Sequence, residues 1–566
     1  MHLSKKRGRT ALRIGEGNEI SVMAVTINQG SLSARTETYN PSPMVVVEPN
    51  IKLRLVVMLT LAALLVSLMP LLAVTYPPLH DFPFHLARIQ ILTHLQNGTV
   101  LQEYYRVGSF ILPNVAMDIV MYALAAALPI AIAGQLFIAM IFVLLVTGTM
   151  ALHRVLHGRF SVWPILSAVC LYNWIFLFGF VNYLFGLGLM LWGFAAWIMI
   201  EPRRELLRLV AGSIIALLLF FSHLAALGVY AVAVAAFELQ SVLGRPQAWS
   251  RNLRRLAIGA LPFALPLGLL LLASPTGDKI GAGVTFNFWP GWKPLALYRT
   301  LLSGNALLDA TTPIVLGSVL VAILCAGRIR IARPMRLAIV AISLTFLVAP
   351  TNLMGALLLD ARLPIAIVFI AIASTAVGFR NASVGRVVAV AIAGLLLFRA
   401  VALTVSWAGY ERIQNEFIDA FVKIPAGSAM FVGTGGPLPS LLFTHDEELE
   451  FWRPPLKHIV SLATVVKPIF VPATWADPTQ QPITVAPRYS PMKALQGNNP
   501  FSPAIVSSDD LTRLIVKIHE AQHNVGDNHD AYLLLLYPDR ALEWPQQAVP
   551  VASGSRFVLF NVGGPS

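Results

Sequence analysis

The stretch with the most suggestive chemistry follows directly after the first long apolar run of this chain. The run extends from residue 55 to residue 74, and the stretch behind it carries Asp81, His85 and Arg88 at helical spacing. An acid, an imidazole and a guanidinium at a membrane boundary are costly to place there without a reason. We therefore expect the chemistry of the protein at this stretch.

Further polar side chains stand near the tips that connect later apolar runs. They are Asn182, Tyr183, His223, Asp360 and Arg362. Polar groups at membrane depth usually line cavities or pair with each other, so one shared cavity costs less than separate burials. We predict that these residues line one outer-facing cavity with Asp81, and that they bind substrate together with His85 and Arg88.

Each candidate also has a structural explanation. Asp81 could cap a helix that starts ahead of Pro83, because aspartate satisfies free amides there. His85 could be an ordinary interfacial histidine. Arg88 and Arg362 could extend to the lipid headgroups. Asp360 could form a structural ion pair with Arg362. His223 and Asn182 could be hydrogen-bonding residues at helix tips. The aromatic segment 286–292 fits an interfacial belt or a sugar platform.

Composition identifies the class of protein. The mean hydropathy of +0.70, with 56% hydrophobic and 12% charged residues, indicates a polytopic α-helical membrane protein. The net charge of +13 arises largely from short basic segments between apolar runs, as the positive-inside rule requires, and no nucleic-acid partner is predicted. Cys170 and Cys325 both lie in apolar runs, which argues against a disulfide framework or a cysteine metal site.

About eleven apolar runs are long enough to span a membrane. They lie near residues 54–75, 131–152, 161–178, 181–200, 207–222, 224–241, 256–274, 312–327, 335–350, 361–378 and 385–405. Counting the apolar segment 114–128 as a further span would move the basic turns to the outer side. We therefore predict that it is an interfacial helix in the first outer loop, capped by Asn114 and closed by Pro129.

This topology gives three parts. Residues 1–50 are polar, lack an apolar signal core and are predicted to be a disordered cytoplasmic tail, with Met44 as a possible alternative start. Residues 51–405 form the transmembrane domain. Residues 406–566 form a small α/β domain outside the membrane, with strands at 428–434, 531–537 and 556–562 and a helix whose buried face includes Leu511 and Ile518.

The overall pattern resembles a known superfamily. An acid after the first span, an interfacial helix over 84–96 closed by Asn97-Gly98, a Pro113-Asn114 turn, a second interfacial helix and many spans are similar to the GT-C superfamily of polyprenyl-phosphate-dependent glycosyltransferases. That superfamily includes lipid A aminoarabinose transferases and protein mannosyltransferases. The strings DFPFHLAR from Asp81 and GFVNYLFG from Gly179 also resemble those of bacterial multispanning proteins.

The resemblance implies a glycosyltransferase of the bacterial inner membrane with its C-terminal domain in the periplasm. It implies that Asp81 is the catalytic base of an inverting hexosyl or pentosyl transfer, from a polyprenyl-phosphate donor to a lipid or glycan acceptor. Arg88 or Arg362 would stabilise the departing phosphate. The chain departs from the metal-using pattern because no second acid adjoins Asp81, so no metal or other cofactor is expected.

Two other functions fit a polytopic protein. A transporter or lipid flippase is the first, although the sequence lacks the internal repeats that many transporters show. A non-catalytic scaffold for assembly of an envelope polysaccharide is the second. Replacing Asp81 should matter for catalysis and be nearly silent for a scaffold.

Overall fold

The computed structural model describes residues 52–95, 98–244, 249–281, 283–435, 458–497, 503–539 and 542–563. The predicted tail 1–50, with its alternative start at Met44, lies outside the described residues. Asn97, the predicted end of the first interfacial helix, lies outside them as well.

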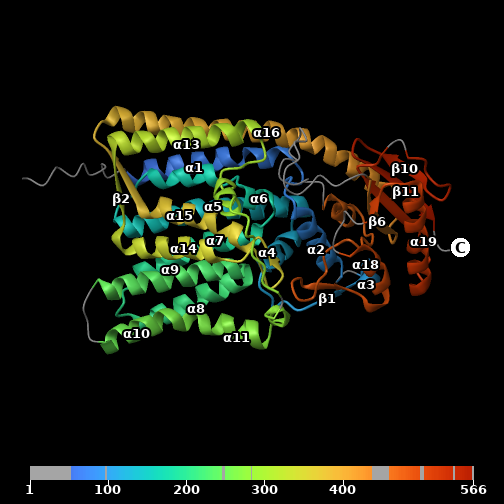
Figure 1. Ribbon diagram of the computed structural model, residues 1–566, viewed down its shortest axis with the longest axis horizontal. Helices are drawn as coiled ribbons and strands as arrows, with labels where there is room; N and C mark the ends of the chain where they lie inside the picture. Colours follow the sequence, from blue (N-terminus) through green and yellow to red (C-terminus); the bar gives the residue numbers. More distant parts are fainter. Residues whose placement is uncertain are drawn as a thin grey trace, which may run out of the picture. The chain divides into compact units, whose positions relative to one another are not determined.

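Helices dominate the first three quarters of the chain (Figure 1). The helices up to residue 272 are α1 (Leu53–Leu68), η1 (Met69–Ala73), α2 (Phe82–His94), α3 (Leu101–Tyr104), α4 (Ala116–Ala125), α5 (Ile130–His157), η2 (Trp163–Cys170), α6 (Trp174–Leu177), α7 (Val181–Met199), α8 (Glu205–Ser222), α9 (Leu224–Leu243), α10 (Trp249–Ala260), η3 (Leu261–Phe263) and α11 (Ala264–Leu272). Those that follow are η4 (Pro275–Lys279), α12 (Trp292–Tyr298), α13 (Ala306–Ala326), η5 (Arg333–Met335), α14 (Arg336–Val348), α15 (Leu359–Ser374), α16 (Ala382–Val422), η6 (Ile459–Ser461), α17 (Leu462–Val466), η7 (Pro487–Tyr489), α18 (Ser490–Gln496) and α19 (Ser508–Val525).

The predicted polytopic helical fold is confirmed. Eight helices or continuous helical segments among the described residues are long and apolar enough to cross a membrane: Leu53–Ala73, Ile130–His157, Val181–Met199, Glu205–Ser222, Leu224–Leu243, Trp249–Leu272, Ala306–Ala326 and Ala382–Val422. Each coincides with a predicted span. The other three predicted spans are shorter helices, namely the η2–α6 segment, α14 and α15.

The segment predicted to be a second interfacial helix forms α4, which has only 10 residues. Such a helix is about 15 Å long, half of what a bilayer core requires. Its N-cap is Val115 rather than the predicted Asn114, whose φ of 77° is left-handed. Asn114 therefore adopts a turn conformation that asparagine tolerates better than most residues. Pro129 precedes α5, as predicted.

Helix α16 links the membrane part to the C-terminal part of the chain. Its 41 residues correspond to about 60 Å, roughly twice the thickness of a bilayer core. It runs alongside α13, contacts β5 near its start and reaches β10 with its second half (Figure 1). The predicted boundary at residue 405 falls inside this helix, where Tyr410, Phe417 and Phe421 continue a buried face.

The C-terminal part contains the predicted α/β domain. Its sheet has the strand order β10-β11-β9-β6-β8. The bounds are β6 (Ala429–Gly435), β8 (Ala504–Ile505), β9 (Ala531–Leu536), β10 (Val549–Ser553) and β11 (Phe557–Gly563). β6 pairs in parallel with β8 and β9, and the β9-β11-β10 ribbon is antiparallel. α19 buries Leu511, Leu514, Ile515 and Ile518, as its apolar spacing predicts.

Three two-stranded sheets complete the described strands. They pair β1 (Tyr105–Val107) with β7 (Ile483–Val485), β2 (Gly327–Ile331) with β5 (Thr375–Phe379), and β3 (Asn352–Leu353) with β4 (Ala356–Leu357). All three pairs are antiparallel. The β1–β7 pair joins the segment between α3 and α4 to the C-terminal domain, so segments about 380 residues apart are fixed to each other.

Glycines allow the two central helices α5 and α7 to pack closely. A Cβ on Gly188 would meet the Leu144 Cβ at 2.6 Å, and one on Gly148 would meet the Leu191 Cβ at 2.9 Å. Small residues permit such close approach of helix backbones in membranes. α7 is thereby held firmly, and its N-terminal end carries two of the predicted site residues, Asn182 and Tyr183.

Candidate active site

A cavity of about 910 Å³ lies between the membrane helices and the C-terminal part of the chain. Six of the eight predicted site residues line it: Asp81, His85, Arg88, Asn182, His223 and Arg362. The other two, Tyr183 and Asp360, are fully buried and lie behind its wall. The C-terminal part contributes His458, Trp475, Asp477, Gln480 and Gln481. Sequence positions from 80 to 481 thus meet at one site.

Asp81 occupies the N-cap position of α2, yet its side chain makes no capping hydrogen bond. The preceding turn is fixed by its backbone, because the His80 amide donates to Leu177 O at 2.8 Å and the Asp81 amide to Phe178 O at 3.2 Å. The carboxylate Oδ1 faces His458 Nε2 at 3.4 Å and His80 Nε2 at 3.8 Å. Asp81 therefore presents its carboxylate to the cavity between two imidazoles.

Gly179 explains why the loop before α7 can approach Asp81. Its φ is +90°, and a Cβ on it would stand 2.7 Å from the Asp81 amide nitrogen. A residue with a side chain would be strained by the backbone conformation and would also collide with the turn. The glycine at the start of the predicted GFVNYLFG string is thus a requirement of the site.

Arg88 has a carboxylate partner that the sequence analysis missed. Its Nε and Nη2 donate to the two carboxylate oxygens of Asp118 in α4, the second bond being 3.0 Å long. Its Nη2 also lies 2.8 Å from His85 Nδ1. Burial, and then the Arg88 charge, hold the pKa of His85 well below its usual range, so the ring is neutral at pH 7. The backbone of Gly179 is the other partner of His85. These contacts tie α2 to α4 and to the loop at Gly179.

Arg362 has a different environment. Its Nη1 lies 2.8 Å from His223 Nε2, its Nη2 donates to Leu357 O at 2.9 Å, and its guanidinium carbon lies 4.0 Å from the centre of the Phe180 ring. Its buried Nε has no hydrogen-bond partner among the described residues. Asp81 lies within electrostatic range of it. The part of the chain that the structure describes gives Arg362 no salt bridge, in contrast to Arg88.

His223 and Arg362 face each other as two donors. The Ala225 amide donates to His223 Nδ1 at 3.0 Å, and burial together with the Arg362 charge holds the pKa of His223 well below its usual range. A neutral imidazole has one N–H, so its proton lies on Nε2, opposite the guanidinium. Two donors 2.8 Å apart are unfavourable when buried. No atom fits between nitrogens at that distance, so an anionic oxygen could accept from both only after the two side chains move apart.

Tyr183 and Asn182 support this wall from α7. The Tyr183 hydroxyl donates to Arg362 O at 2.7 Å, and its ring meets the His223 ring edge-on at 5.5 Å. The Asn182 amide accepts from the Met117 amide at 2.7 Å and donates to Asn114 O at 2.8 Å. Asn182 thus provides a hydrogen-bond acceptor for a backbone amide at the start of α4. Tyr183 helps to position Arg362 and His223.

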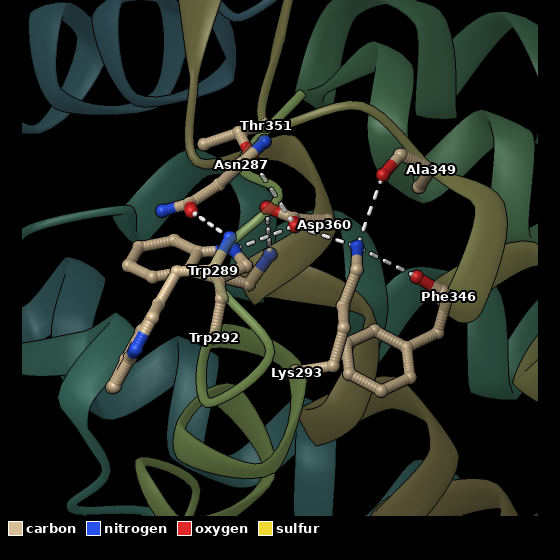
Figure 2. Close-up of polar contacts among 9 residues, drawn as sticks. Asn287, Trp289, Trp292, Lys293, Phe346, Ala349, Thr351 and Asp360 are labelled. Atoms are coloured by element: carbon tan, nitrogen blue, oxygen red, sulfur yellow. Dashed lines mark hydrogen bonds and ion pairs between the residues drawn. The ribbon is translucent and has the colours of Figure 1, made fainter. Parts of the chain in front are cut away.

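The proposed ion pair between Asp360 and Arg362 is wrong. Figure 2 shows the Asp360 carboxylate turned toward the start of α12, where Lys293 Nζ and Trp292 Nε1 each lie 2.7 Å from Oδ2. Lys293 also donates to Phe346 O and Ala349 O at 3.0 Å each (Figure 2). α15 directs the side chains of residues 360 and 362 to different sides, because residues two positions apart on a helix are rotated by about 200° around its axis. Asp360 anchors α12 against the end of α14.

The aromatic segment divides into two environments. Phe286, Phe288 and Trp289 are exposed, whereas Trp292 is buried and bonded to Asp360. The exposed rings fit either of the two interpretations given above, and the belt and the sugar platform both stay predictions.

Three contributors were not found by sequence reasoning. His458 lies in a region without periodic pattern, and nothing in the sequence links it to Asp81. Asp118 left a signal, since it is a lone acid inside an apolar segment, and a buried acid needs a partner. Phe180 was quoted within a motif, but its contact with Arg362 follows from the fold alone.

Among the comparisons with known proteins, the one with solved structures finds a similar fold. The sequence matches no protein-family model and no curated protein sequence. The structure is similar to ArnT from Cupriavidus metallidurans bound to undecaprenyl phosphate, with a TM-score of 0.52 over 91% of this chain and 100% of that one. The chain has the fold of ArnT. The apo structure of ArnT gives a TM-score of 0.50 over 91% of this chain and 99% of that one, and the sequence identity is 12% in both comparisons.

ArnT is a GT-C glycosyltransferase, so the predicted resemblance to that superfamily is confirmed at the level of the fold. The ArnT fold is that of a polytopic membrane protein, in agreement with the eight long apolar helices. At 12% identity the likeness concerns the fold and not individual side chains.

Proposed function

We propose that this protein is a glycosyltransferase of the bacterial inner membrane, which moves a sugar from a polyprenyl-phosphate donor to an envelope acceptor on the outer face. One observation carries the proposal: Asp81 and Arg362 line a single large cavity in a chain with the ArnT fold. A carboxylate and a guanidinium are the two groups that such a transfer needs, one for the acceptor proton and one for the phosphate.

Asp81 is the proposed base. Its carboxylate takes the proton of the acceptor hydroxyl as that oxygen attacks the anomeric carbon, and the bond from that carbon to the phosphate oxygen breaks on the opposite face. The sugar configuration is thereby inverted. General-base catalysis of this kind contributes about 10²–10⁴-fold to the rate. The reaction releases polyprenyl phosphate.

Arg362 is the proposed phosphate ligand, with His223 beside it. The N–H groups of these two side chains support the assignment, since a phosphate oxygen that moves them apart from their 2.8 Å contact would accept from both. Arg88 is the weaker candidate because Asp118 already accepts both of its parallel hydrogen bonds. We assign Arg88, His85 and Asn182 to positioning α2 and α4.

The apolar walls of the cavity favour a lipid-linked donor. Val232, Leu270 and Ile342 line it on the membrane side, whereas Gln480 and Gln481 line it from the C-terminal part. A polyprenyl chain would lie along the apolar wall, and the sugar would lie toward the polar residues. No nucleotide-binding loop is required for such a donor.

The proposal is tested with the purified full-length chain in liposomes. A panel of radiolabelled polyprenyl-phosphate sugars is offered with an envelope lipid extract as acceptor, and release of polyprenyl phosphate is followed. We expect turnover of at least one donor by the wild type and a large loss in Asp81→Asn. Movement of the intact donor across the bilayer without cleavage would instead establish a flippase. Donor binding without turnover under all conditions would favour a scaffold.

A further inference from the structure

We propose that His80, Asp81 and His458 form a binding site for a transition-metal cation of the zinc class. One ligand atom of each residue can be chosen so that all three atoms lie within 4.8 Å of one another. The three side chains line the cavity from positions 378 residues apart in the chain. Their convergence is therefore a property of the tertiary fold.

The separations between Asp81 and the two imidazoles are close to those between ligands of one cation. The Asp81 Oδ1 lies 3.4 Å from His458 Nε2 and 3.8 Å from His80 Nε2. An N–H···O bond is roughly 2.7–3.2 Å long. Two ligands of one tetrahedral zinc ion, each about 2.0–2.2 Å from the metal, are roughly 3.3–3.6 Å apart. Small ring rotations would bring all three atoms to that separation.

The donor set selects the class of metal. Two imidazoles and one carboxylate suit zinc, manganese, cobalt or ferrous iron, whereas magnesium and calcium prefer oxygen ligands. Three protein ligands that border a cavity leave a position for water or substrate, as in catalytic zinc sites. From the sequence no metal was expected, because no second acid adjoins Asp81, but the fold brings His458 to that place.

Aromatic packing holds both imidazoles in place. The Phe84 ring lies 4.0 Å from the His458 ring between centres, and the Phe178 ring lies 4.9 Å from the His80 ring. Both histidines are nearly buried, with exposed fractions of 3% for His80 and 6% for His458. Ligands that are fixed before the metal arrives lose little conformational entropy when they bind it.

The site is compatible with the proposed transfer. Both imidazoles face Oδ1 of Asp81, at 3.4 and 3.8 Å, so a cation held there would leave Oδ2 outside its coordination sphere. Oδ2 is then the oxygen that would take the acceptor proton. This use of the cation rests on the proposed function, whereas cation binding itself does not.

Zinc titration of the full-length chain in nanodiscs tests the inference. The protein is stripped with a chelator, and zinc binding is measured by calorimetry for the wild type, His80→Gln and His458→Gln. Because replacing groups that merely orient metal ligands already costs about 10–100-fold in affinity, we expect at least a 100-fold loss in each variant. His523→Gln is the matched control, since His523 is exposed on α19, and its affinity should equal that of the wild type.

A second variant keeps the test decisive if the glutamine variants fail to fold. His458→Cys retains a metal ligand, and a cobalt-loaded sample should show a thiolate-to-cobalt charge-transfer band that the cobalt-loaded wild type lacks. Absence of saturable zinc binding by the wild type would overturn the site. Unchanged zinc affinity in both glutamine variants, or absence of the band in a folded His458→Cys, would overturn it as well.

The two proposals fail separately. Zinc binding at this site without sugar transfer by any donor would contradict the glycosyltransferase and leave the metal site standing. Full transfer by a wild type that binds no zinc would contradict the metal site alone.

Discussion

Gly179 packs directly against the backbone of Asp81. A Cβ on Gly179 would stand 2.7 Å from the Asp81 amide nitrogen and 2.9 Å from the Asp81 Cβ, and the φ of Gly179 is +90°. The loop before α7 thereby defines one side of the turn that presents the proposed base. The position of the carboxylate depends on a residue 98 positions further along the chain.

Gly179→Ala should impair the site more than an ordinary loss of glycine would. The left-handed conformation alone costs about 1–2 kcal/mol for a residue with a side chain. The contact with Asp81 adds a displacement of the turn, so we expect transfer to fall by at least tenfold. The measurement is the transfer rate of the folded variant, with unfolding temperature as the second readout.

Gly158→Ala is the matched control for that substitution. Gly158 has a φ of +71°, and nothing lies within 4 Å of a Cβ placed on it. An alanine at position 158 would therefore have the unfavourable backbone conformation without a collision with neighbouring atoms. Equal losses of activity in the two alanine variants would contradict the proposed role of the Gly179 contact.

Asp118→Asn should destabilise the fold. Arg88 and Asp118 are 2% and 0% exposed, and removing one partner of a buried ion pair typically costs about 3–5 kcal/mol. Thermal unfolding in detergent measures the effect. The double variant Arg88→Met with Asp118→Leu should recover most of the loss, because it leaves no buried charge.

Glu201→Gln provides the comparison for the buried pair. Glu201 and Arg203 form an exposed pair at 3.3 Å, with exposed fractions of 55% and 91%. Such pairs contribute little to stability, so the unfolding temperature should not change. A similar small effect for Asp118→Asn would show that the Arg88 pair is not structural.

Arg362→Lys should weaken donor binding although it keeps the charge. An ammonium cannot form the two parallel hydrogen bonds that a guanidinium makes with a phosphate, and it stacks less well on Phe180. We expect about a tenfold or greater rise in the donor KM with normal expression. Arg330→Lys, at an exposed residue of β2, should behave as the wild type. Full activity of Arg362→Lys would leave the phosphate without its proposed partner.

Acidic pH should destabilise the protein through His85. Its folded-state pKa is depressed by burial and by Arg88, so below the unfolded-state value of about 6.5 the unfolded chain binds the proton and the folded chain does not. Stability is therefore retained above pH 6.5 and falls as the pH drops below it. His223 contributes in the same direction.

His85→Gln separates this effect from general acid sensitivity. Glutamine does not titrate and still offers an acceptor to Arg88 and a donor to the Gly179 backbone. The drop in unfolding temperature between pH 7.5 and 5.5 should be smaller than in the wild type. His523→Gln should leave the drop unchanged, and an unchanged drop in His85→Gln would contradict the prediction.

Apolar length predicted the long membrane helices well, whereas the sidedness inferred from the basic turns stays a prediction. Each of the eight long helical segments coincides with a predicted span, because burial in lipid requires continuous apolar helices regardless of tertiary detail. The strands β6, β9 and β11 were also predicted, since short apolar runs bounded by turn residues are typical of buried strands. Helix α16 shows the limit of this kind of prediction. It continues beyond the end of its apolar run, because its second half is held by tertiary contacts.

The partners of the polar residues could not be predicted in the same way. The sequence placed Asp360 beside Arg362, but the helix turns their side chains apart, and Lys293 of α12 binds the Asp360 carboxylate instead. Likewise, Arg88 was expected to meet a phosphate, and Asp118 occupies its guanidinium. The three-dimensional fold determines which charged residues from distant segments pair with each other. The sequence shows only that a charged residue in an apolar segment needs a partner.

The rate of sugar transfer by Asp81→Asn in liposomes is the most direct test of Asp81 as the catalytic base. Asparagine keeps the size of the side chain and much of its capping ability while it removes the proton acceptor. With a donor that the wild type uses, the account predicts a folded variant whose transfer rate is lower by about two to four orders of magnitude. Asp509→Asn, at an exposed acid of α19, should transfer at the wild-type rate. Near-normal transfer by Asp81→Asn would contradict the role of this carboxylate as base and, with it, the central claim.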